Sequence, residues 1–251
     1  MSAQRRFLVI AHRGASAYAP ENTLAAFDRA LELGFPHLEL DTHLSADGHV
    51  VVIHDDTLER TTSGRGRVAE HTLAQLRALD AGAWFGGREF QGQRVPALEE
   101  VLGRYRGRAH LHVELKGRQP DLPRAVLALV DAHNARGAVT LTSFHRELVA
   151  EARRLAPDVP VGWLVPQLTE EVIEEARALG LAYLCPRAAT VAAEQVARAH
   201  RRGVLVRPWG VRSPDDVRHA VRAGAVGLTA DWPDVAQRIV EEELAAQRGT
   251  P

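Results

Sequence analysis

The chain has 251 residues, of which 45% are hydrophobic and 25% charged, so it can bury the core of one large domain. Its 31 Lys and Arg nearly balance 32 Asp and Glu, and this net charge of -1 excludes the global positive field on which nucleic-acid binding depends. The single cysteine, Cys185, excludes an intramolecular disulfide, and no apolar run approaches the roughly 18 residues of a membrane helix. We therefore expect a soluble cytoplasmic protein with a small-molecule ligand, no nucleic-acid partner and no stable membrane insertion.

Short apolar runs alternate with helical patterns along the chain. This alternation predicts a parallel sheet with helices outside, and eight such units in 251 residues favour a closed (β/α)8 barrel, or TIM barrel, over an open sheet. The expected strands are 7–11, 37–42, 110–115, 138–142, 159–164, 181–185, 203–208 and 225–229. The expected helices are 22–33, 97–105, 121–135, 146–155, 169–179, 190–202, 214–223 and 232–246.

Several residues are typical of helix ends and agree with these boundaries. Asn22 is expected to cap the first helix, and Gly34 follows its last turn. The run Ser213-Pro214-Asp215 is typical of a helix N-terminus that carries proline in its first turn. These signals support the helix positions independently of the hydrophobic pattern.

One connection is much longer than the others. Residues 43–96 lie between the second strand and the next helix, and this segment is rich in glycine. A connection of this length usually has a function of its own. Asp47-Gly48, between two apolar runs, is typical of a hairpin turn. We therefore expect one domain, residues 1–251, in which residues 43–96 form a small cap subdomain inserted after the second strand.

Acidic side chains alternate with apolar ones in two expected strands. Because residues two apart in a strand point to the same face, Glu39 and Asp41 leave the second strand together, and Glu114 leaves the third. Three carboxylates inside a barrel are costly unless they are paired or bind a metal, and ligation by oxygen alone favours Mg2+ or Ca2+. The sequence therefore predicts a divalent metal site. The alternative is a cluster of ion pairs with Arg13 and Lys116.

Two of the 12 histidines, His12 and His54, directly follow apolar runs and are followed by charged residues. Imidazoles at strand exits over a barrel mouth suit acid-base catalysis near neutral pH. Arg13 adds a planar, permanently charged group that matches phosphoryl oxygens. We therefore expect His12 and His54 to move protons and Arg13 to neutralise charge beside the metal.

Four stretches carry a family resemblance: "AHRGASAYAPENTLAAF", "LELDTHLSADGHVVVIHDDTLERTTSGRGRV", "LDAGAWF" and "VPALEEVL". They resemble the motifs of glycerophosphodiester phosphodiesterases, which are metal-dependent TIM-barrel enzymes, and the similarity is most specific from residue 8 to about residue 116. The resemblance implies hydrolysis of a glycerophosphodiester to glycerol 3-phosphate and an alcohol. It also implies that residues 43–96 are the family's inserted cap.

The resemblance further implies a role for each matching position. The acid-base pair would be His12 and His54, and the contacts to phosphate would come from Arg13 and Lys116. The metal ligands would be Glu39, Asp41 and Glu114.

The later strand ends match the family more loosely, through "LTSFHRELVAEAR", "VRPWGV" and "GLTADWPD". Where the family often has Trp-Thr-Val-Asn, this chain has Trp209-Gly210-Val211-Arg212. Trp209 is a candidate apolar wall for the glycerol, with ordinary barrel packing as the alternative. The departure bears on the side of the pocket that would receive the leaving alcohol.

Other functions remain open at this point. A metal amidohydrolase would usually have His-x-His after the first strand, whereas this chain has His12-Arg13-Gly14. A phospholipase-like phosphodiesterase acting on membrane phospholipid would need an exposed apolar rim, for which Trp84-Phe85 and Phe90 are candidates. A non-catalytic phosphate-binding barrel would not need two histidines. The sequence also leaves open the nucleophile, the order of the histidines' roles, the alcohol, the metal and the oligomeric state.

Overall fold

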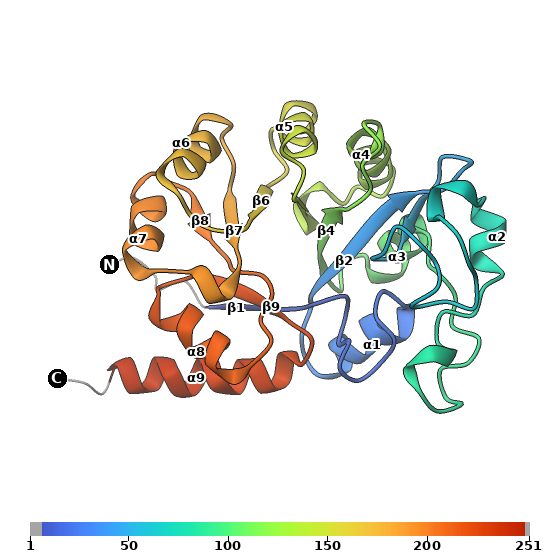
Figure 1. Ribbon diagram of the computed structural model, residues 1–251, viewed down its shortest axis with the longest axis horizontal. Coiled ribbons are helices and arrows are strands. Elements are labelled where there is room, and N and C mark those ends of the chain that lie inside the picture. Colours follow the sequence, from blue (N-terminus) through green and yellow to red (C-terminus); the bar gives the residue numbers. More distant parts are fainter. Residues whose placement is uncertain (1–6, 249–251) are drawn as a thin grey trace.

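The computed structural model describes residues 7–248 and shows a barrel of eight parallel strands surrounded by helices (Figure 1). The strands are β1 (Leu8–Ala11), β2 (His37–Leu44), β3 (Val50–Val52), β4 (His110–Leu115), β5 (Val139–Ser143), β6 (Val161–Val165), β7 (Tyr183–Pro186), β8 (Leu205–Val206) and β9 (Gly227–Ala230). Neighbours follow the order β8-β7-β6-β5-β4-β2-β1-β9, with β3 antiparallel to β2. The strands at the two ends of this order, β8 and β9, also meet. The N–H of Val226, directly before β9, donates to the carbonyl of Val206 in β8 at 2.9 Å, which closes the barrel. The predicted (β/α)8 barrel is confirmed.

Helices α4 to α7 form an arc outside the strands, and α9 runs along one side (Figure 1). The helices are α1 (Leu24–Glu32), α2 (Leu73–Arg77), α3 (Leu98–Tyr105), α4 (Leu122–Ala132), α5 (Arg146–Leu155), α6 (Glu170–Ala178), α7 (Ala193–Arg201), α8 (Pro214–Arg222) and α9 (Pro233–Arg248). Short 3-10 turns are η1 (Val68–Glu70), η2 (Ala83–Phe85), η3 (Arg136–Ala138) and η4 (Ala188–Thr190). Within residues 7–248, no helix is long and apolar enough to cross a membrane.

The alternation of side chains in β2 divides the apolar core from the functional interior. Leu38 and Leu40 are buried in the main apolar cluster together with the buried faces of the surrounding helices. Glu39 and Asp41, one residue further along in each case, are therefore turned to the opposite face. The same holds in β4, where Val113 belongs to the main apolar cluster and the next residue, Glu114, is turned to the opposite face. The barrel thus carries carboxylates inside because its outer face is needed for helix packing.

The N-terminus of α1 differs from the sequence prediction. Thr23, and not Asn22, is the N-cap, and its hydroxyl accepts a hydrogen bond from the Ala26 N–H at 3.3 Å. Asn22 adopts a left-handed backbone conformation, with φ of 57°, and its side chain bonds to Asp41 instead. At α8 the prediction is confirmed, because Ser213 caps the helix in a capping box.

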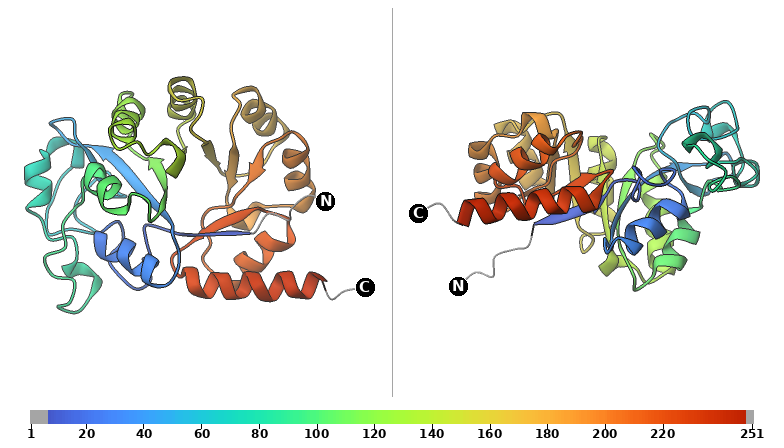
Figure 2. Two further views of the ribbon diagram at one scale, coloured as in Figure 1. Left: turned by 180° about the vertical axis from the view of Figure 1, so that it is seen from behind. Right: turned by 90° about the horizontal axis from the view of Figure 1, so that it is seen from below.

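Residues after β2 build a small apolar cluster separate from the barrel core. The chain turns at Gly48, whose N–H donates to the Ser45 carbonyl at 3.0 Å, and returns as β3. The cluster beyond this hairpin consists of Val51, Ile53, Leu58, Val68, Leu76, Ala81 and Val95. In Figures 1 and 2 the segment that contains α2 lies at the outer edge of the barrel. The prediction that residues 43–96 form a cap subdomain stays a prediction.

Candidate active site

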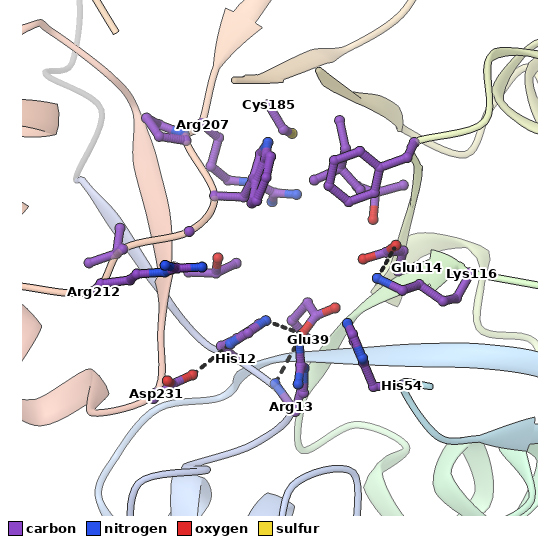
Figure 3. Close-up of a pocket in the computed structure, with 18 residues that line it drawn as sticks. His12, Arg13, Glu39, His54, Glu114, Lys116, Cys185, Arg207, Arg212 and Asp231 are labelled. Carbon is purple, nitrogen blue, oxygen red and sulfur yellow. Dashed lines mark hydrogen bonds and ion pairs between the residues drawn. The ribbon is translucent and has the colours of Figure 1, made fainter. Parts of the chain in front are cut away.

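The carboxyl ends of the barrel strands open into one pocket (Figure 3). Of the residues predicted to act here, those that line the pocket are His12, Arg13, Glu39, His54, Glu114, Lys116 and Trp209. The remaining predicted residue, Asp41, is 1% exposed and lies beside Glu39 and Glu114. The structure therefore brings all the predicted site residues together, although they come from segments distant in the sequence.

The three predicted metal ligands form a compact acidic cluster. Glu39, Asp41 and Glu114 each direct one carboxylate oxygen to a region in which these oxygens lie within 4.8 Å of one another. Parallel pairing of β2 with β4 places Asp41 directly beside Glu114, which explains the contact. All three side chains are buried. Buried oxygens at this spacing form a suitable donor set for a hard divalent cation.

Burial and mutual repulsion strongly perturb this cluster. Burial, with the nearby charge of Asp41, raises the pKa of Glu39 to about 7 and that of Glu114 to about 8. Burial would also raise the pKa of Asp41, but the positive charges of Arg13 and nearby groups hold it at about 2. The cluster therefore resists carrying three negative charges at neutral pH unless a cation offsets them.

Arg13 is held in place by its backbone as well as by its side chain. Its φ of 54° is left-handed, and its N–H donates to Glu39 Oε2 at 3.0 Å. The next residue, Gly14, lies so close to α1 that an added Cβ would stand 2.5 Å from the Ala26 carbonyl carbon. The Arg13 guanidinium reaches Glu21 at 2.8 Å and Asp41 at 3.2 Å.

The basic residues within the site are fewer than its carboxylates. Lys116 Nζ lies 3.1 Å from Glu114 Oε1 and 3.8 Å from Asp41 Oδ1. Arg13 is shared with Glu21, so the cluster has one carboxylate more than the cations beside it. This deficit of positive charge fits a bound metal ion better than a closed set of ion pairs.

Each of the two histidines is oriented by an aspartate. His12 Nδ1 lies 2.6 Å from Asp231 Oδ1, and His54 Nδ1 lies 2.6 Å from Asp55 Oδ1. Since Nδ1 is engaged in both rings, Nε2 is the nitrogen left for chemistry in the pocket. His12 Nε2 stands 3.9 Å from Glu39 Oε2. This arrangement is typical of imidazoles positioned for proton transfer.

The pKa values of the two histidines shift in opposite directions. Burial lowers the pKa of His12, but the hydrogen bond to Asp231 and the charge of Glu39 outweigh it, and the net shift is upward. Burial also lowers the pKa of His54, and the charges of Arg13 and Lys116 add to this, so the net shift is downward. The site thus gives its two histidines different electrostatic environments.

Sequence reasoning missed four residues that support the site. Asp231 follows β9 as His12 follows β1, and only the pairing of these strands makes them neighbours. Arg60 donates to Asp55 at 2.7 Å and to Glu21 at 2.8 Å, so it links the aspartate behind His54 to the carboxylate beside Arg13. Asp55 could have been noticed from its position next to His54, but nothing in the local sequence pairs Arg60 with Glu21.

The strand ends of this barrel carry an acidic cluster, two histidines that each contact an aspartate, and two basic residues. This is the organisation of a TIM-barrel hydrolase. Residues 12–235 match the model of the glycerophosphoryl diester phosphodiesterase family. The chain belongs to this family and is a phosphoric diester hydrolase.

Curated relatives share nearly the whole chain. A glycerophosphodiester phosphodiesterase of Caldanaerobacter subterraneus subsp. tengcongensis is 35% identical over 239 residues, which cover 94% of this chain and 98% of that protein. A glycerophosphodiester phosphodiesterase of Bacillus subtilis is 31% identical over 254 residues, covering 93% of this chain and 86% of that protein. The similarity therefore extends well beyond the sequence motifs of the first half.

A solved structure gives the same fold. A phosphodiesterase of Oleispira antarctica in complex with the product sn-glycerol-3-phosphate is 30% identical and superimposes with a TM-score of 0.88. The match covers 93% of this chain and 96% of that one. The fold is thus shared over nearly the whole length of both chains.

Proposed function

We propose that this protein hydrolyses glycerophosphodiesters to glycerol 3-phosphate and an alcohol by metal-dependent acid-base catalysis. The observation that carries the proposal is the convergence in one pocket of two aspartate-oriented histidines, His12 and His54, on an acidic cluster flanked by Arg13 and Lys116. The names of the relatives, including the glycerol 3-phosphate complex, support the same substrate class.

The metal would be held by Glu39, Asp41 and Glu114, and the oxygen donors favour Mg2+ or Ca2+. When bound, such an ion would supply neutralisation of phosphate charge. Arg13 and Lys116 would orient the phosphoryl oxygens, since their cationic groups already face this part of the pocket. Trp209, which donates its indole N–H to the Val165 carbonyl at 3.1 Å, would present a fixed apolar wall to the glycerol.

The histidines would divide the proton transfers. One removes the proton of the nucleophile, and the other protonates the departing alkoxide, so that no strongly basic alkoxide is released. The nucleophile is either water or the neighbouring glycerol hydroxyl, which would first form a cyclic phosphate. A diester without a neighbouring hydroxyl, bis(p-nitrophenyl) phosphate, separates these routes, because only direct attack by water would cleave it at a comparable rate.

The segment inserted after β2 would also contribute to the proposed activity. Residues 43–96 would act as a cap subdomain, stabilised by the apolar cluster that they build beyond β3. This segment contributes His54 to the pocket and fixes it through Asp55 and Arg60. The cap would therefore complete the catalytic pair as well as border the pocket.

The experiment that tests the proposal is direct. The protein is incubated with glycerophosphoglycerol and Mg2+ or Ca2+, with and without excess EDTA, and released glycerol 3-phosphate is measured. We expect release that EDTA abolishes and added metal restores. Phosphatidylglycerol vesicles serve as the control substrate, since faster cleavage of the intact lipid would favour the phospholipase-like alternative. Absence of product from all water-soluble diesters would refute the proposal.

A further inference from the structure

The pocket is chemically asymmetric. The carboxylates that line it, Glu39, Glu114 and Asp231, come from the side formed by β2, β4 and the end of β9. The other side, from β5 to the loop after β8, has no acidic side chain among the pocket-lining residues of the described chain. We refer to this side as the basic wall, which comprises Thr142, Phe144, Leu164, Cys185 and residues 207–212.

Arg212 is an exposed cation at the mouth of the basic wall. Its backbone N–H donates to Asp216 Oδ2 at 2.9 Å, so the capping box of α8 fixes its position. Its guanidinium forms no ion pair or hydrogen bond with any residue from 7 to 248, whereas Arg218 and Arg222 on the following helix pair with Asp215 and Glu243. Figure 3 shows Arg212 across the pocket from Lys116.

Arg207 places a second positive charge in the same wall. Its side chain is only 3% exposed, donates to His112 Nδ1 at 2.8 Å and lies over the ring of Tyr183 at 4.9 Å. Among the residues that the structure describes, it has no carboxylate partner. A buried guanidinium without a counter-ion makes the potential of the adjoining pocket positive.

The aromatic rings of the basic wall are already engaged by cations of the protein. The Arg187 guanidinium lies over Trp209 at 5.3 Å, and the Lys116 ammonium lies over Phe144 at 5.5 Å. The two rings also pack edge to face, with centroids 4.9 Å apart. These cations compete with a quaternary ammonium for the two rings and repel it, so this wall is poorly suited to choline.

We propose that the exposed end of the basic wall, at Arg212, faces the alcohol, while the more buried Trp209 faces the glycerol. Arg212 would then make the enzyme select glycerophosphodiesters whose alcohol carries a negative charge, either a carboxylate or a second phosphate. This inference rests on the proposed function. The glycerol half is the same uncharged group in every substrate, so the charge of the wall can discriminate only through the alcohol. The alcohol also varies in size and needs the open mouth of the pocket, where Arg212 lies.

Two substrate pairs test the proposal, because each differs by one anionic group. The first is glycerophosphoinositol 4-phosphate against glycerophosphoinositol, and the second is glycerophosphoserine against glycerophosphoethanolamine. We measure kcat/KM for each, because this quantity is not altered by non-productive binding. In the wild type we expect the first ratio to be about tenfold, the effect of about 1.4 kcal/mol from one charge-assisted contact.

Substitution of Arg212 provides the decisive comparison. Arg212→Gln should lower both ratios toward one, and Arg212→Lys should retain most of the preference. Arg106→Gln, at an exposed position outside the pocket, removes the same charge and should leave both ratios unchanged. Each ratio is internal to one variant, so partial loss of folded protein does not affect it.

The outcomes separate this inference from the proposed function. Wild-type kcat/KM ratios above one that become smaller in the Arg212→Gln variant support the proposed selectivity. Wild-type ratios at or below one, or ratios that Arg212→Gln does not change, overturn it while leaving the proposed function intact. If no diester yields glycerol 3-phosphate with either metal, the proposed function fails and this inference fails with it.

Discussion

Glu114→Gln tests whether the acidic cluster is a metal site or a set of ion pairs. The substitution keeps the shape of the side chain and replaces the carboxyl by an amide, which cannot ionise. Because the pKa of Glu114 is raised to about 8, its carboxyl is largely protonated at pH 7 in the metal-free protein, and glutamine resembles that form. We therefore expect little change, or a small gain, in the thermal stability of the variant in EDTA.

The size of the expected effect can be worked out from the stabilisation that a bound metal ion gives. A divalent ion at a hundredfold excess over its Kd should stabilise the wild type by roughly 2.7 kcal/mol, which for a chain of this size raises Tm by roughly 5 to 11 °C. In Glu114→Gln this rise should shrink, and activity should fall with it. Glu99→Gln, on the exposed surface of α3, is the control and should respond to metal as the wild type does.

The pH dependence adds an independent check with a defined sign. A carboxyl whose pKa is raised on folding binds its proton more tightly in the folded state, so metal-free stability should fall as pH rises from about 4.5 through about 8. Excess metal should remove much of this loss, because it favours the ionised carboxylates. Thermal melts in EDTA, Mg2+ and Ca2+ at pH 5, 7 and 8.5 measure both effects. If the wild-type melt moves with neither ion, the metal site is refuted.

Three further predictions concern the remaining parts of the site. His12→Ala and His54→Ala should each reduce kcat by at least ~10²-fold with unchanged folding by circular dichroism, and a variant that keeps a third of the activity would remove that histidine from the mechanism. Asp231→Asn weakens the interaction that raises the pKa of His12, so the limb of the kcat/KM pH profile that His12 controls should move to lower pH; an unmoved limb would contradict the pairing. Replacing residues 60–92 by a short glycine linker should give a folded, poorly active protein, and loss of cooperative unfolding would show that the cap is part of the core.

The sequence by itself determined the barrel and the inward carboxylates, because both depend on local periodicity. Alternation of strands and helices requires parallel pairing, and the two-residue period of β2 and β4 turns Glu39, Asp41 and Glu114 away from the face that packs against the helices. His12 and His54 were recognisable for the same reason, since each directly follows an apolar run. In each case the information lies within a few consecutive residues.

Only the tertiary structure decided how these residues are supported. Closure of the barrel sets β1 against β9, which joins His12 to Asp231 across 219 positions, and no local spacing encodes that contact. Asn22 has the chemistry of a helix cap, yet its side chain bonds to Asp41 because the turn after β1 brings it there. Within residues 7–248 the Arg212 guanidinium has no ionic partner, and this too is decided by the tertiary structure, because it depends on every element that folds around the pocket.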